Sequence, residues 1–352
     1  MGRFFKENKI ERHAELVSAS HRFRNKFGMT GRKLVFFLLF LYTTVSCFSQ
    51  QITPKDSLTK KQKTIRKSIL LGTTGAYTAA SLSYLNIIWY KPYKSTNFHF
   101  FNDNSEWCQM DKMGHTFTTY NTAREMYRAM KWAGFTDNQS IFYGEAYGAL
   151  YMTAIEIMDG FSTEWGFSWG DETANISGSL LFTLQQRFWN EQRIHLKYSF
   201  HQDYYSGIRP SELGNSFGSQ LIKNYNGQTY WLSVSLASFF KKDTKFPKWI
   251  ALDFGYGANG MISGESNVIV HPDGSTSVNS IKNQSIIIAA NGSQQTFSRY
   301  RQFYFSLDID FTKIKTKSKF LQSVFSVVNG FKVPFPAIEF SKHGVKAYGL
   351  YF

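Results

Sequence analysis

The sequence contains little cysteine and little charge. Two of its 352 residues are cysteines, which excludes a disulfide-stabilised scaffold. Charged residues make up 18%, below the value of about 25% that is typical of soluble proteins. The chain also lacks internal repeats and low-complexity tracts. Repeat arrays and charge-rich disordered chains are therefore excluded at the outset.

Aromatic residues, in contrast, are abundant. The chain has 34 Phe, 20 Tyr and 8 Trp, enough to build a large core or a membrane-facing surface. Its length suits one large domain or two domains of ordinary size. Composition alone predicts a folded protein and leaves open whether its apolar groups face a core or a lipid.

The first part of the chain is predicted to be a targeting segment. Residues 34–42 form an apolar run that follows Arg32 and Lys33 and precedes small and polar residues, which is the order of a secretory signal. The run is shorter than the roughly 20 residues needed to span a bilayer. We therefore predict a signal peptide over residues 29–49 and an upstream segment, residues 1–28, that does not belong to the fold.

Two processing events are open for this signal. Cleavage after Ser49 would leave Gln50 as the new N-terminus, and lipidation of Cys47 is the alternative. A retained anchor is the third possibility. After cleavage Cys108 remains as a lone cysteine, for which a packing role is predicted.

Most of the net charge of +15 lies near the N-terminus. Residues 1–49 carry +6 and residues 50–67 carry +5, which leaves +4 for residues 68–352. The basic balance thus reflects a targeting segment and a basic linker at 50–67, and no nucleic-acid partner is predicted. The linker could touch anionic lipid, although a solvated segment is the simpler interpretation.

The remaining chain divides into two halves with different periodicities. Residues 68–190 read as helical, with helices predicted over 68–90, 111–132, about 140–158 and about 171–189, and with Ser168 or Asp171 as the start signal of the last. From residue 191 to residue 352 apolar and polar residues alternate, as in strands. The predicted fold class is α+β, a helical bundle followed by an antiparallel β half.

The β half fits two arrangements. Strands of about ten residues with one apolar face and a C-terminal aromatic residue are typical of an outer-membrane, barrel-like strand set, and the same pattern fits a sheet packed on the helices. Asn226–Gly227, Asp273–Gly274 and Asn291–Gly292 are predicted hairpin turns. Residues 315–330 are predicted to form a short amphipathic helix, and 333–336, with two prolines, a segment unsuited to a central strand.

Polar residues in the helical half form one candidate site. Asp and His stand four residues apart on the second helix, two acidic residues stand three apart near the end of the third, and Asp and Asn stand four apart on the fourth. If these stripes converge, they build a polar cluster. Its members are Asp111, His115, Glu156, Asp159, Asp171 and Asn175, with Gly114 and Gly178 allowing close helix approach.

Three interpretations of this cluster remain open. The ligand types of His115, Glu156, Asp159 and Asp171 suit a hard or borderline divalent metal. Alternatively, His115 is an acid–base catalyst positioned by Asp111. The third interpretation is a satisfied polar network that fixes helix register, with Lys112 as counter-charge.

The same motifs resemble a known family. The Asp-Lys-x-Gly-His helix (111–115), the Glu-x-x-Asp-Gly helix end (156–160) and the Asp-x-x-x-Asn-x-x-Gly helix start (171–178) are similar to the YfiM-type family of periplasmic lipoproteins, known as domain of unknown function 2279. They are more distantly similar to VanZ-like membrane proteins. Residues 224–233 resemble a longer version found in chains of Bacteroidetes type.

The resemblance implies an envelope location and a compact helical unit but no activity. We therefore expect a protein of a Gram-negative cell envelope, in the periplasm or at the outer membrane, with a membrane or envelope component as partner. A structural or interaction role at the periplasmic face of the outer membrane is the first hypothesis. The alternative is a hydrolase-like or metal-binding enzyme that acts on a lipid-linked envelope substrate through the polar cluster.

Overall fold

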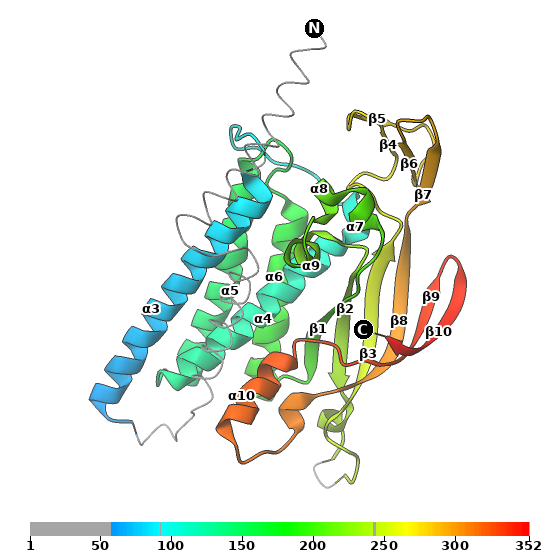
Figure 1. The fold of residues 1–352 in the computed structure, drawn as a ribbon. Helices are drawn as coiled ribbons and strands as arrows, with labels where there is room; N and C mark the ends of the chain where they lie inside the picture. Colours follow the sequence, from blue (N-terminus) through cyan, green and yellow to red (C-terminus); the bar gives the residue numbers. More distant parts are fainter. Residues whose placement is uncertain (1–57, 92, 242–243, 352) are drawn as a thin grey trace.

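The computed structural model describes residues 58–91, 93–241 and 244–351. The predicted upstream segment, the signal peptide with Cys47 and Ser49, and residues 50–57 of the predicted linker lie outside these residues. A helical half precedes a β half (Figure 1), which confirms the α+β class.

The helical half consists of four long helices and two short turns. They are α3 (Lys60–Leu85), its π-helical continuation η2 (Asn86–Tyr90), the 3-10 turn η3 (Glu106–Gln109), α4 (Met110–Trp132), α5 (Asp137–Gly160) and α6 (Trp169–Trp189). Ser168 caps α6 by accepting from the backbone N–H of Asp171, as its sequence position predicts. The last three helices agree with the predicted ranges to within a few residues.

The first helix begins earlier than predicted. Thr59 and Gln62 form a capping box, and α3 starts at Lys60, inside the segment that the sequence suggested was a linker. The basic side chains of residues 60–67 therefore lie on the first two turns of a helix. Arg66, for example, donates to the carbonyl oxygen of Trp132 at 2.9 Å.

Glycines let α5 and α6 pack tightly on α4. A Cβ atom on Gly178 of α6 would lie 2.3 Å from the carbonyl oxygen of Thr116, and one on Gly144 of α5 would lie 2.7 Å from that of Ala123. Gly114, by contrast, faces the hydroxyl of Tyr230 in the β half. The close approach predicted for Gly178 is therefore present between helices, whereas Gly114 allows α4 to approach the sheet.

The β half contains two sheets. The larger has the order β1-β2-β3-β8-β9-β10 and is antiparallel throughout, and the smaller has the order β5-β4-β6-β7, in which β4 and β6 pair in parallel. The strands are β1 (Ile194–Phe200), β2 (Gln228–Ser235), β3 (Ile250–Asn259), β4 (Val268–Val270), β5 (Thr276–Val278), β6 (Gln284–Ile288), β7 (Gln294–Ser298), β8 (Tyr300–Ile309), β9 (Phe335–Ser341) and β10 (Gly344–Tyr351). Short helices fill the connections: α7 (Tyr205–Ile208), α8 (Pro210–Leu213), α9 (Phe217–Lys223), η4 (Leu236–Phe239), η5 (Phe311–Lys313) and α10 (Lys319–Val328).

The large sheet packs on the helical half through α4. The hydroxyl of Tyr120 donates to the carbonyl oxygen of Ile194 at 3.0 Å, and the ring of Phe117 lies 5.7 Å from that of Tyr230. Of the two predicted arrangements, the sheet packed on the helices is the one that the structure fits. Within the described residues, no helix is both long enough and apolar enough to span a membrane.

Two of the three predicted hairpin turns are confirmed, and the third is wrong. Asp273–Gly274 and Asn291–Gly292 join antiparallel strand pairs, and both glycines have positive φ. The prediction for Asn226–Gly227 is wrong, because this turn joins α9 to β2. Its sequence fits a turn, but the preceding segment is helical.

The predicted helix over 315–330 is confirmed as α10, but the proline-containing strand is more central than expected. β9 lies between β8 and β10 although it contains Pro336. This is tolerated because the ladder with β8 ends at the pair Ser306–Ala337, just before the proline.

The large sheet buries its polar face and exposes its apolar face. On β3 and β8, Asp253 and Asp308 are buried, whereas the adjacent Phe254 and Leu307 are 47% and 48% exposed. β9 repeats this alternation, with Glu339 buried and Phe340 exposed. A sheet that faces water on one side normally shows the reverse order.

Charged side chains of the buried polar face form ion pairs with one another or with Lys332. The Lys197 ammonium lies 2.8 Å from Asp308 Oδ2, and the Lys332 ammonium lies 3.9 Å from Asp308 Oδ1 and 4.0 Å from Asp253 Oδ2. All four side chains are at most 5% exposed. We call these four residues the sheet network.

Candidate functional site

A pocket of about 550 Å³ lies between the helical half and the β half and is lined by residues of both. Its walls come from the end of α3 with η2, from α4, from the end of α5, and from the segment between α9 and β2. Aromatic side chains cover much of it, including Tyr84, Trp89, Tyr90, Trp107 and Tyr225. The pocket is therefore aromatic over much of its wall and also contains acidic and basic side chains.

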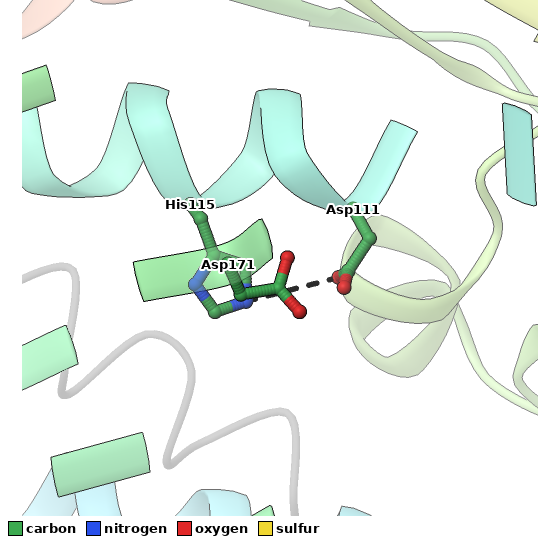
Figure 2. A group of neighbouring side chains, drawn as sticks. All are labelled: Asp111, His115 and Asp171. Carbon is green, nitrogen blue, oxygen red and sulfur yellow. Dashed lines mark ion pairs between the residues drawn. The ribbon is translucent and has the colours of Figure 1, made fainter. Parts of the chain in front are cut away.

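Four members of the predicted cluster line this pocket. Asp111 and His115 project from consecutive turns of α4, Asp171 comes from the first turn of α6, and Asp159 from the last turn of α5. Figure 2 shows the first three turned toward one another. Nε2 of His115 lies 3.9 Å from Oδ1 of Asp111, in accordance with the i, i+4 spacing.

The other two members stand behind His115. Its Nδ1 lies 3.0 Å from Oδ1 of Asn175 and 3.5 Å from Oε1 of Glu156. Thr119 also donates to Oδ1 of Asn175, and the Asn175 amide nitrogen donates to Glu172. This pattern makes Oδ1 of Asn175 an acceptor, so that Nδ1 of His115 carries the proton of this hydrogen bond, and Nε2 lies on the side of Asp111.

Lys112 joins the acidic residues around the site. Its ammonium lies 2.6 Å from Asp103, 2.9 Å from Asp171 and 3.8 Å from Asp111. Burial acts against the charge of Lys112, but these carboxylates outweigh it and raise its pKa. The predicted counter-charge role of Lys112 agrees with these distances.

Burial changes the proton affinity of the surrounding acids. It raises the pKa of Glu156 to about 8 and, with Asp111 adding to the effect, that of Asp171 to about 10. Burial also raises the pKa of Asp159 well above its usual range. For Asp103, hydrogen bonds from Asp171, Lys112 and Ser168 outweigh burial and lower the pKa. Of these two neighbouring carboxyl groups, Asp171 therefore binds a proton more tightly than Asp103.

One group of side chains has the spacing of metal ligands. Asp111, His115 and Asp171 each offer a ligand atom, and these atoms lie within 4.8 Å of one another. Glu156 and Asp159, two of the predicted ligands, are not in this group. Glu156 is 1% exposed, and its Oε1 has no hydrogen-bond partner among the described residues.

Sequence reasoning missed two residues that complete the site. Asp103 lies in the loop before η3, and the hydroxyl of Tyr225 donates to Oδ1 of Asp111 at 2.5 Å. Asp103 stands outside any periodic segment, so no spacing marks it. Tyr225 belongs to the segment at 224–233 that carried part of the family resemblance, which was the one available signal.

The backbone before the site helix is unusual. Trp107, Cys108 and Gln109 have φ values of 44°, 53° and 61°, the left-handed region that non-glycine residues rarely adopt. Cys108 is buried with Met110, Tyr225 and Tyr230. This left-handed turn brings the chain into α4 one turn before His115.

The fold and site define an α+β protein with a polar centre at the wall of an aromatic pocket. Residues 99–187, which include α4, α5 and most of α6, match the family model described as a predicted periplasmic lipoprotein, the domain of unknown function DUF2279. The resemblance is thereby confirmed over this segment, and the family description agrees with a location in the cell envelope.

Searches of the curated proteins and of the solved structures found no match.

Proposed function

We propose that this envelope protein is a hydrolase-like, metal-binding enzyme that acts on a lipid-linked substrate. The observation that carries the proposal is the position of Asp111, His115 and Asp171, whose ligand atoms lie within 4.8 Å at the wall of a 550 Å³ pocket. A polar network that served only helix register would need no such cavity beside it.

The donor set suits a hard or borderline divalent ion. One imidazole nitrogen with carboxylate oxygens is typical of Mn²⁺ or Zn²⁺. The hydrogen bond from His115 Nδ1 to Asn175 orients Nε2 in the way that metal-binding histidines are held. Asp171 would release its proton to the solvent when the ion binds. A bound ion would polarise an ester or phosphoester and generate hydroxide at neutral pH.

The pocket walls suggest the substrate class. Aromatic side chains cover much of the pocket wall, which favours an apolar tail. The Lys223 ammonium also lines the pocket, 5.2 Å from the centre of the Trp89 ring. An amphiphile with an acyl or isoprenoid tail and an anionic head matches both features.

Calorimetric titration with Mn²⁺ and Zn²⁺ tests the proposal. We expect one ion per chain, and we expect His115→Gln to lose binding at least about tenfold while it unfolds at nearly the wild-type temperature. His195→Gln is the matched control: His195 is buried in the sheet, 3.3 Å from Asp310, and its loss should destabilise the fold and leave metal affinity unchanged.

The polar-network interpretation makes the opposite prediction. If no ion binds at millimolar concentration and His115→Gln and Asp171→Ala each cost several kcal/mol of unfolding free energy, the cluster is structural and the enzyme proposal fails.

A second candidate is a structural or interaction role at the periplasmic face of the outer membrane. The exposed apolar face of the large sheet favours it, since such a face needs a non-aqueous neighbour. This candidate has a membrane component as partner and no nucleic acid. Fractionation of the envelope tests the location: recovery as a free periplasmic protein would contradict it, while metal binding would remain unaffected.

A further inference from the structure

The helix α10, like the large sheet, buries its polar side and exposes its apolar side. Ser323 and Ser326 are 1% and 2% exposed, whereas Phe320 and Leu321 are 67% and 41% exposed. The hydroxyl of Ser326 faces Glu125, and its carbonyl oxygen accepts from Arg124, two residues of a buried ion pair on α4. The polar side of this amphipathic helix is thus used inside the protein, and its apolar side is turned outward.

Two basic segments adjoin α10 at one end of the large sheet. The first backbone pair of β3 with β8 is Ile250–Ile309, and the amide of Asp310 donates to Trp249, so the loop before β3 and the loop after β8 meet there (Figure 1, lower end). The ring of Phe311 in the second loop lies 5.7 Å from that of Phe325 in α10. These loops contain the described lysines Lys241, Lys245, Lys248, Lys313, Lys315 and Lys317.

The same end exposes further large apolar side chains. Phe239, Phe240 and Trp249 are 48%, 50% and 44% exposed. Exposure of such large apolar side chains to water is unfavourable in free energy. An outward apolar helix face with a basic rim is typical of elements that lie in the headgroup region of an anionic membrane.

We propose that this end of the molecule, formed by α10 and the two lysine-containing loops, is a surface that inserts into a leaflet with anionic phospholipids, continuous with the apolar outer face of the large sheet. The positive rim selects the lipid over a second copy of the chain, which would bring like charges together. Of the six lysines, only Lys313 has an ion-pair partner among the described residues, Glu191 at 2.9 Å. The inference rests on the proposed membrane location and does not depend on the proposed metal chemistry.

A local fluorescent probe tests the inference in the full chain. The environment-sensitive dye is attached to Phe320→Cys in a Cys47→Ser background, since Cys108 is buried and should not react. Val278→Cys is the matched control, because Val278 is 73% exposed and lies on β5, away from α10. Vesicles contain phosphatidylethanolamine with or without about one quarter phosphatidylglycerol, a composition chosen to vary the surface charge.

We expect the dye at position 320 to shift to the blue and to be quenched by brominated lipid on anionic vesicles, with little change at position 278. Lys315→Glu with Lys317→Glu should weaken the vesicle affinity seen by this probe at least about thirtyfold and reduce its salt dependence. His115→Gln should bind vesicles as wild type does, which separates this result from that of the metal titration.

Three results would overturn the inference. The dye at position 320 could stay in water while the chain is bound to vesicles, or it could respond equally to uncharged vesicles. It could also shift with protein concentration in the absence of lipid, which would assign the surface to a second copy of the chain.

Discussion

The two halves of the molecule each contain a cluster of acidic side chains paired with lysine, and the clusters differ in what surrounds them. In the sheet network, Lys197 and Asp308 are fully enclosed, and neither lines the 550 Å³ pocket. In the helical half, Lys112 and its acids line a cavity, and the side chain of Asp111 is 29% exposed. The comparison teaches that access, rather than the kind of residue, separates a structural network from a candidate site.

The largest effect is expected in the sheet network. Lys197→Met leaves Asp308 without its partner at 2.8 Å, and such a break of a buried pair costs about 3–5 kcal/mol of unfolding free energy. Lys112→Met should cost clearly less, because water from the pocket can solvate Asp111. Urea unfolding of both variants measures the difference. Equal losses would mean that the two clusters are alike and would weaken the site assignment.

A second test concerns the packing that positions the site. Gly178→Ala places a methyl group against the Thr116 carbonyl, and overpacking of this kind costs about 1–3 kcal/mol. It should also weaken metal binding, because α4 carries His115 and α6 carries Asp171. Gly72→Ala on α3 is the control: its Cβ would meet nothing within 4 Å, so a gain of up to about 1 kcal/mol is expected. A neutral Gly178→Ala would show that the helices can separate freely.

The pH dependence of the unfolding free energy should show the raised pKa of Asp253. Burial and the nearby Asp308 raise the pKa of Asp253 to about 8, against a value near 3.8 for the unfolded chain. The folded state therefore holds a proton that the unfolded state releases, and this contribution to stability is full below about pH 4 and lost as the pH rises to about 8. Asp253→Asn removes the titrating group, so the variant should not lose stability through this proton as the pH rises.

The measurement is urea unfolding from pH 5 to pH 8. The stability of Asp253→Asn relative to wild type should increase across this range. Asp308→Asn is the contrasting variant, because it removes the partner of Lys197 and should destabilise the fold at each pH. A constant difference between wild type and Asp253→Asn would show that Asp253 is ionised throughout.

The smallest effect is expected on the outer face of the large sheet. Phe303 is 53% exposed, so Phe303→Thr should change the unfolding free energy by less than about 0.5 kcal/mol in detergent-free buffer. Phe182, which is fully buried between α4 and α6, is the control, and Phe182→Ala should cost about 3–5 kcal/mol. A large loss for Phe303→Thr would indicate that another surface covers this face in solution.

Local signals predicted much of the fold. Ser168 marks the start of α6, and the glycine turns at Asp273 and Asn291 mark two hairpins, because caps and turns depend on neighbours in the sequence. The start of α3 differs from the prediction because the basic residues at 60–67 are typical of a solvated segment, whereas the Thr59–Gln62 capping box begins the helix before them. Asn226–Gly227 failed because a turn sequence does not reveal which elements it joins.

For the candidate site, the sequence by itself determined which side chains share a helix face. The i, i+4 pairs Asp111–His115 and Asp171–Asn175 follow from helical periodicity alone. Likewise, period-two alternation determined that the strands have one polar and one apolar face. These properties are local, since they depend on backbone geometry within one element.

Only the tertiary structure decided what these faces meet. It placed Asn175 and Glu156 behind His115, brought Asp103 to Lys112 and Tyr225 to Asp111, and opened the pocket beside them. It also turned the polar face of the large sheet inward and the apolar face outward, a choice that alternation leaves undetermined. The physical reason is that burial and contact between distant segments depend on how the elements pack, and periodicity within one element carries no information about its neighbours.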